Sequence, residues 1–250
     1  MESKKIYYII IPFGILVIWA AFSNLKIVSP LFLPTPQAVF LELGNLFVSG
    51  VILPDIFYTL YRTFLGFMIA CLVGIPLGLL MGYSDKVYYS LEFVVEFFRS
   101  IPATALFPLF LLFFGVGDTS KIALTAWTAG LVLILNSMYG VHLGKELRIK
   151  AAKTMRISGF NLFKKIIFPE ALPQVFNGMR VAISLSLIIV VVTEMFIGTN
   201  FGLGHRIIDA QLVYQISEMY AVILTTGILG FLTNKSFIFI EKRIVHWQGK

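Results

Sequence analysis

The fold follows from residues 63–82, which read TFLGFMIACLVGIPLGLLMG. No side chain in this stretch carries a charge. A helix rises about 1.5 Å per residue, so about 20 apolar residues are enough to cross a hydrocarbon layer about 30 Å thick. A helix also satisfies its own backbone N–H and C=O groups, for which lipid offers no partner. The stretch therefore predicts a membrane-spanning helix.

The rest of the chain repeats this pattern. Hydrophobic residues make up 58% of the 250 and charged residues only 13%, whereas a soluble domain has about 25% charged residues. We therefore predict an all-α membrane protein with six transmembrane helices in a single domain over residues 1–250. The first apolar segment is longer than a signal-peptide core of roughly 7–15 residues, so we expect it to be a retained span. The five other apolar segments are 6–25, 100–117, 122–141, 175–198 and 219–240.

Basic residues indicate the orientation of these spans. The loop 143–173, between the fourth and fifth spans, holds seven basic and two acidic residues. The segments expected on the other side of the membrane hold only Lys26, Arg62, Lys121 and Arg206. Because positive loops stay in the cytoplasm, we predict that this loop and both termini are cytoplasmic. Two explanations of the loop's charge are open: it anchors to anionic lipid head groups, or a soluble partner grips it.

Two local patterns concern helix packing. Small residues recur every fourth position in the second span, a spacing that lets a neighbouring helix approach closely. Residues 87–99 have the pattern of an amphipathic helix. The tripeptide Ser100-Ile101-Pro102 then predicts the N-cap and first turn of a new helix, and a hinge or a part of a transport path. The small residues of the stripe are Gly66, Ala70, Gly74, Gly78 and Gly82.

The basic loop also carries a recognisable motif. Ala151-Ala152 is followed at fixed distances by Ile166 and by Phe168-Pro169. This arrangement resembles the Glu-Ala-Ala (EAA) loop of binding-protein-dependent ABC importer permeases. That family's pattern is Glu-Ala-Ala, three residues, Gly, nine residues, Ile, one residue, Leu, Pro. Three positions depart from the pattern, with Lys150 in place of Glu, Arg156 in place of Gly and Phe168 in place of Leu; we expect Gly159 to take over the turn.

The resemblance covers roughly residues 33–243 and is closest to the sulfonate, taurine and nitrate branch of the family. It rests on motifs distributed along the chain: Leu60-Tyr61-Arg62, Gly74-Ile75-Pro76-Leu77-Gly78, Arg99-Ser100-Ile101-Pro102, Thr193-Glu194-Met195 and Gly202-Leu203-Gly204.

The resemblance implies the type I ABC importer permease fold and a place in a bacterial inner membrane. It implies that the loop inserts a coupling helix into a groove of a cytoplasmic ATPase, with Ala152 and Gly159 facing that groove. The implied partners are two ATPase subunits, an extracytoplasmic substrate-binding protein and a second copy of this chain. ATP and magnesium would then be bound by the ATPase, so we expect no cofactor in this chain and no nucleic-acid partner. The implied cargo is a small solute, most simply an anion such as a sulfonate, taurine, nitrate or bicarbonate, with a neutral heterocyclic precursor also open.

The residues themselves fit a separate energy source. The chain has no G-x-x-x-x-G-K-[ST] sequence, which would cradle phosphate groups. Its three histidines, His142, His205 and His246, are too scattered for a metal site. Two other classes stay open as alternatives. A secondary active transporter would need inverted repeats and midplane ionisable residues, and a membrane-embedded enzyme would need clustered acid, base or metal-binding groups.

Charges inside membrane spans are costly and often functional. Glu194 lies near the outer end of the fifth span, and Arg62 lies near the outer end of the second. We expect these two residues to pair. The pair would either fix the register of the helices or act as an outer gate along the path.

Overall fold

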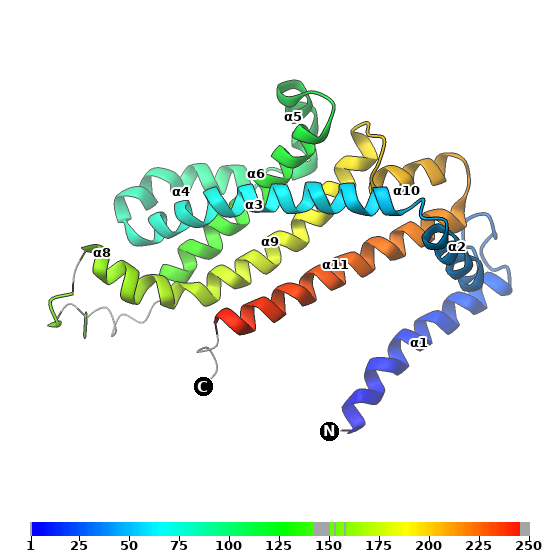
Figure 1. Cartoon of the computed structure of the whole chain (residues 1–250), viewed down its shortest axis with the longest axis horizontal. Coiled ribbons are helices and arrows are strands. Elements are labelled where there is room, and N and C mark those ends of the chain that lie inside the picture. The colour runs from blue at the N-terminus through cyan, green and yellow to red at the C-terminus, as the bar shows by residue number, and fades with distance from the viewer. Residues whose placement is uncertain (1, 143–150, 153, 158, 246–250) are drawn as a thin grey trace.

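The structure, a computed structural model, describes residues 2–142, 151–152, 154–157 and 159–245, with side chains from residue 10 onward. The described part of the chain is helical and has no strand (Figure 1). In chain order its elements are α1 Glu2–Asn24, α2 Pro36–Val48, α3 Leu53–Tyr83, α4 Asp85–Arg99, the 3-10 helix η1 Ala103–Leu106, α5 Phe107–Phe114, α6 Asp118–His142, α8 Gly159–Leu162, the π-helix η2 Phe163–Ile167, α9 Phe168–Phe196, α10 Leu203–Leu212 and α11 Ile216–Ile244.

The small-residue stripe of α3 packs against α6. A Cβ added to Gly66 would lie 2.8 Å from Thr125, and one added to Gly78 would lie 2.3 Å from the carbonyl of Ile134. The residue numbers of the two helices increase together along the contact, so α3 and α6 run in the same direction. The close approach that the spacing predicted is therefore an intramolecular contact, and it forms the centre of the bundle.

The other long helices pack around this pair. Gly140 and Gly178 bring α6 against α9, which runs the opposite way, and α11 lies along α9 and α2 (Figure 1). Four helical stretches are long and apolar enough to span a membrane: α3, α6, α11, and the continuous stretch from Gly159 to Phe196. These confirm the second, fourth, fifth and sixth predicted spans, although α3 begins ten residues earlier than predicted.

The first predicted span corresponds to α1, which leaves the bundle (Figure 1). Its C-terminal end is attached to the segment after it, because Trp19 Nε1 donates to the carbonyl of Pro34 at 2.9 Å and Ser23 Oγ donates to that of Leu33 at 3.0 Å. The large apolar side chains between Ile10 and Val17 are exposed. This helix therefore presents apolar surface that nothing else in the described chain covers.

The third predicted span, residues 100–117, was wrong as a single helix. The segment belongs instead to a bent pair, α4 and the η1–α5 segment, whose axes differ by 91°. Ser100 ends α4, and its Oγ donates to the carbonyl of Glu96, so it is not the N-cap of a new helix. Pro102 causes the break, because its ring lacks an N–H and disfavours helical geometry at the residue before it.

The basic loop also ends earlier than predicted. We expected it to extend to residue 173, but α9 begins at Phe168 and contains both Pro169 and Pro173. Pro169 is tolerated in the first turn because its missing N–H has no partner there in any helix. The helical segment from α8 through η2 therefore continues directly into the fifth predicted span.

Candidate functional site

The most highly charged buried site lies at the end of the bundle opposite residues 151–170. Arg62 and Glu194, for which pairing was expected, are brought together there: Arg62 Nη1 donates to Glu194 Oε1 at 2.6 Å. Both side chains are 2% exposed or less. The guanidinium of Arg62 also donates to Asp118, to Thr199 Oγ1 and to the carbonyl of Phe201. One side chain of α3 thus connects α6, α9 and the segment before α10.

Glu194 is held from several directions. Thr59 Oγ1 lies 2.9 Å from its Oε2, and the N–H of Gly204 donates to the same oxygen at 3.1 Å. The turn at Gly202 and Gly204 must be free of side chains, because a Cβ on Gly202 would lie 2.5 Å from the Glu194 carboxyl carbon. Gly202 also has a φ of +149°, in a region that favours glycine. The Gly-Leu-Gly motif therefore seats the start of α10 on a buried carboxylate.

Lys121 is a residue that the sequence analysis misplaced. We counted it among charges in external loops, but it lies in the first turn of α6 and is fully buried. Its Nζ donates to the carbonyls of Gly117 at 3.0 Å and Gly198 at 3.3 Å. Arg62 is likewise buried, so neither residue is a solvated loop charge. The signal that could have identified Lys121 is its position directly before an apolar span.

A second ion group adjoins the first. Arg206 of α10 pairs with Asp55 of α3 and with Glu218 of α11, the latter at 2.9 Å. Asp55 in turn accepts from the N–H of Gly202 at 2.8 Å. Burial would lower the pKa of Arg206, but its hydrogen bonds with Asp55 and Glu218 raise that pKa above its ordinary value. Arg206 therefore stays charged and ties α10 to the ends of α3 and α11.

Together these groups form what we call the end network: Asp55, Thr59, Arg62, Asp118, Lys121, Glu194, Arg206 and Glu218. Its donors and acceptors satisfy one another; Arg62, Lys121 and Glu194 are almost completely buried, whereas Asp118, Arg206 and Glu218 are partly exposed. Such a site is suited to holding the helices in one arrangement and not to catalysing a reaction. Within the described residues no group of three or more His, Cys, Asp or Glu side chains could hold a metal ion.

The EAA-like segment lies at the other end of the bundle. Lys150 lies outside the described residues. Ala152 was expected to face a partner, but it is 2% exposed and packs with Leu79, Leu162 and Ile167 inside the chain. Ile166 and Phe168 are half-buried against the same cluster, and Pro169 starts α9. The small residue at 152 is thus required by this chain's own core.

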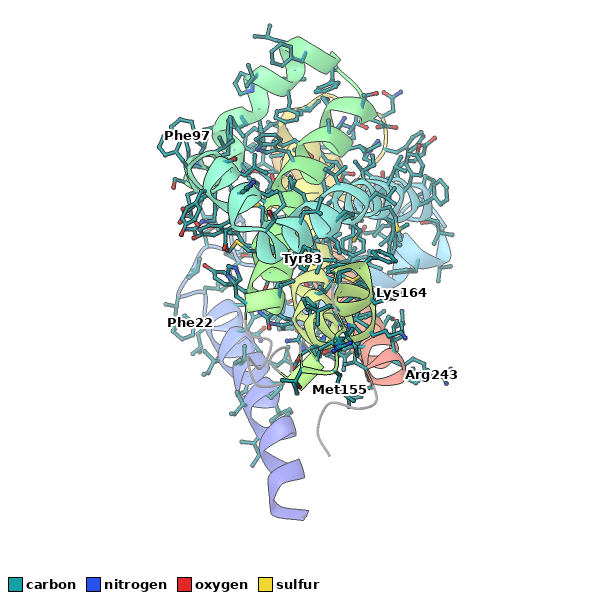
Figure 2. All side chains as sticks on the ribbon, turned by 90° about the vertical axis from the view of Figure 1, so that its left-hand side faces the viewer. Phe22, Tyr83, Phe97, Met155, Lys164 and Arg243 are labelled. Atoms are coloured by element: carbon teal, nitrogen blue, oxygen red, sulfur yellow. The ribbon has the colours of Figure 1, made fainter. Side chains whose placement is uncertain are left out.

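The exposed face of this segment, which we call the loop-end surface, has a different composition. Met155 and Phe160 are each 74% exposed, and Arg156, Lys164 and Lys165 of the same segment are exposed as well. Figure 2 looks onto this end of the molecule, where Met155 and Lys164 both lie at the surface. Two large exposed apolar side chains and three exposed cations in one short segment are typical of an interaction surface.

Backbone geometry explains one departure from the family motif. Arg156 has a φ of +59° and Gly159 a φ of +58°. The position where the family has Gly is therefore left-handed in this chain too, although Arg occupies it. Gly159 does not replace that turn but adds a second one three residues later.

The helix break brings a further set of residues to the surface. Ser100 and Pro102 are exposed and Ile101 is half-buried, at the point where α4 ends. They lie beside the middle of α6, because the ring of Phe98 stacks edge-on against Trp127 at 5.0 Å. The structure does not bring them to the end network or to the loop-end surface.

Comparison with known proteins agrees with this architecture. The family model for the binding-protein-dependent transport system inner membrane component matches residues 74–248. The chain belongs to this family. A taurine transport system permease protein of Escherichia coli (strain K12) is 30% identical over 241 residues, which cover 94% of this chain and 87% of that protein. A nitrate import permease protein of Synechocystis sp. (strain PCC 6803) is 33% identical over 196 residues, 78% of this chain and 71% of that protein.

Solved structures show the same fold. The inward-facing MetNI methionine ABC transporter matches with a TM-score of 0.66 at 21% identity, over 78% of this chain and 95% of that one. The protein is therefore a multi-pass, inner-membrane permease subunit of an ABC importer with the type I fold.

Proposed function

We propose that two copies of this permease enclose the path of an importer for a small anion, driven by two cytoplasmic ATPase subunits and supplied by an extracytoplasmic binding protein. The observation that carries this proposal is the extent of the likeness to the taurine permease, which covers 94% of this chain. One relative is named for nitrate, an anion, and the other for taurine, a zwitterion with a sulfonate group, and both names support a cargo that carries an anionic group.

The loop-end surface supports the ATPase contact. It combines the two exposed apolar residues Met155 and Phe160 with cations, in the segment that matches the EAA motif. A cleft of about 520 Å³ beside it is lined by Met155, Lys165 and Pro169 among others. Because Ala152 is buried, we assign ATPase docking to the loop-end surface. Ala152 instead packs the segment against α9.

The helix directions support the proposed topology. In α3, α6 and α11 the chain runs toward the loop end, and in the bent pair and α9 it runs away from it. If the basic loop is cytoplasmic, the C-terminal end of α11 is cytoplasmic as well. The end network then lies on the extracytoplasmic side, where the binding protein would deliver the cargo.

A copurification experiment tests the ATPase contact. The affinity-tagged chain is extracted from its native membranes, and its partners are identified and quantified by mass spectrometry. We expect a stoichiometric ATP-binding subunit with the wild-type chain. Phe160→Asp and Met155→Asp should reduce its recovery by about tenfold or more, because a buried interface position accepts a charge at a cost of a few kcal/mol.

Leu212→Asp is the matched control, because Leu212 is 71% exposed at the opposite end. It should copurify the ATPase at the wild-type level. Normal ATPase recovery with both loop-end variants would remove the docking role from this surface. A secondary active transporter predicts no ATP-binding subunit with any variant.

A further inference from the structure

We propose that Arg99, at the break between α4 and η1, is an anion-binding residue in the transport path, and that the cavity beside it takes a small organic monoanion. This inference rests on the proposed function and adds the site and chemical class of its cargo. Four observations carry it: the depth of the break, the exposure of its charges, the composition of the cavity and the free donors of Arg99.

The break lies at the middle of the membrane-spanning bundle. Phe98 contacts Trp127, which lies nine residues after the start of α6 at Asp118 and fifteen before its end at His142. At about 1.5 Å per residue these distances are about 14 Å and 22 Å. The start of α4 is near the loop end, because Tyr88 contacts His142. Arg99 therefore lies at a depth where the surroundings of the bundle are hydrocarbon.

The charges at this depth are open to the outside of the chain. Arg99 and Glu96 form an ion pair at 2.6 Å, yet their side chains are 55% and 43% exposed. Ser100 and Pro102, where the helix has ended, are exposed as well. Lipid cannot face an exposed ion pair and a broken helix, since such groups occur at membrane depth only where they line a water-filled cavity or are covered by protein. This face of α4 therefore faces the interior of the assembly rather than lipid, where the proposed path runs between the two copies.

The cavity beside the break has the composition of a ligand site. It has a volume of about 300 Å³ and lies between the break, α6 and α9. Among the residues that the structure describes, Arg99 alone brings a charge to its lining, and Thr128 supplies a hydroxyl group. Most of its other walls are apolar, with Trp127, Leu185 and Ile189 among them. Pockets for small organic molecules are similarly apolar with a few polar groups that orient the ligand.

Arg99 has donors left for a ligand. Its Nε and Nη2 both donate to Glu96 Oε2, which fixes the plane of the guanidinium. Within the described residues, its Nη1 donates to no other group. A guanidinium has five N–H donors in a fixed fork that matches the oxygens of a sulfonate or carboxylate. The head group of an organic anion would bind there, and its apolar part would contact Trp127 and Ile189.

Charge-selective cysteine labelling tests the proposal in vesicles from cells that carry the whole importer. In a Cys71→Ser background, Ser100→Cys is treated with the anionic sulfonatoethyl methanethiosulfonate and, separately, with its cationic trimethylammonium analogue. We expect labelling by both reagents, with the anionic one favoured. Arg99→Gln should reduce that preference by about tenfold, because the local concentration of anions follows the local potential. Arg99→Lys should keep most of it.

The controls separate this proposal from the proposed function. Leu72→Cys is 71% exposed among apolar neighbours at a similar depth, and it should remain unlabelled if it faces lipid. Ser100 is exposed next to Arg99 at the break, whereas Thr128 lines the cavity itself, so Thr128→Cys probes the cavity directly and replaces Ser100→Cys if the latter reduces yield. Failure of both cysteines to react, or an unchanged preference in Arg99→Gln, would overturn the anion site. The copurified ATPase would be unaffected by either result, so the importer function would stand.

Discussion

At the scale of single residues, Arg62 shows how one side chain can hold several helices. Its guanidinium binds Asp118, Glu194, Thr199 and the carbonyl of Phe201. Arg62 and Glu194 are almost completely buried, so the loss of either one leaves the other as a buried charge without its main partner. Exchanging the two residues would therefore not restore the site. The other hydrogen-bond acceptors are placed around an arginine at position 62.

We predict that Arg62→Ala and Glu194→Ala each destabilise the protein by about 3–5 kcal/mol. The double variant should lose less than the sum of the two, since the residues are in contact and their effects are coupled. Asp118→Asn should cost less, because Asp118 is 39% exposed and water can replace part of its interaction. Thermal unfolding of the purified protein in detergent measures these differences. Strictly additive losses would show that the pair contributes no coupling.

At the scale of elements, the contact between α3 and α6 depends on the absence of side chains at one face of α3. A methyl group at Gly78 would meet the carbonyl of Ile134 at 2.3 Å, and backbone atoms cannot move aside as a side chain can. The helices would have to separate along their whole contact, which also holds α9 in place.

We predict that Gly78→Ala destabilises the protein by about 1–3 kcal/mol, the usual cost of overpacking a core. Gly130→Ala is the matched control on α6, because a Cβ there would meet no atom within 4 Å. It should be neutral or stabilising, since Ala favours a helix over Gly by about 1 kcal/mol. Melting temperatures of the two variants compare them directly. A Gly78→Ala variant as stable as Gly130→Ala would mean that the helices can separate at no cost.

At the scale of the whole molecule, the chain has two specialised ends and a polar break between them. The end network fixes α3, α6, α9 and α10 at one end, and the loop-end surface continues into α9 at the other. A displacement of the loop-end surface would therefore be carried along α9 to Glu194. This continuity, rather than a flexible loop, physically connects the two ends of the chain.

We predict opposite accessibility of the two ends in intact cells. In the Cys71→Ser background, Val213→Cys should be labelled by an impermeant reagent from outside, and Met155→Cys only after the membrane is opened. Both positions are exposed, at 62% and 74%, so a cysteine at either one is open to the reagent on its own side of the membrane. Labelling of Met155→Cys from outside would reverse the proposed orientation and place the loop-end surface out of reach of an ATPase.

The sequence by itself determined the class, the principal spans and the pairing of Arg62 with Glu194. Membrane spans can be read locally, because hydrocarbon forces each segment to satisfy its own backbone and exclude charge. The pair could be anticipated because a charge inside a span requires a partner. The stripe of α3 predicted a close contact but not its partner, since spacing on one helix carries no information about the other.

Other features of the fold and the site depend on tertiary contacts. Lys121 lies directly before an apolar segment, where a buried and a solvated position look alike in sequence, and Arg206 lies between two apolar segments, where its partners Asp55 and Glu218 come from distant helices. Ala152 has the motif's small residue, but whether it faces inward or outward depends on Leu162 and Ile167 folding back over it. The third apolar segment is long enough to span a membrane. It bends instead, because Pro102 breaks the helix at a point where α6 and α9 leave a cavity. These features depend on contacts between distant segments, which no local pattern records.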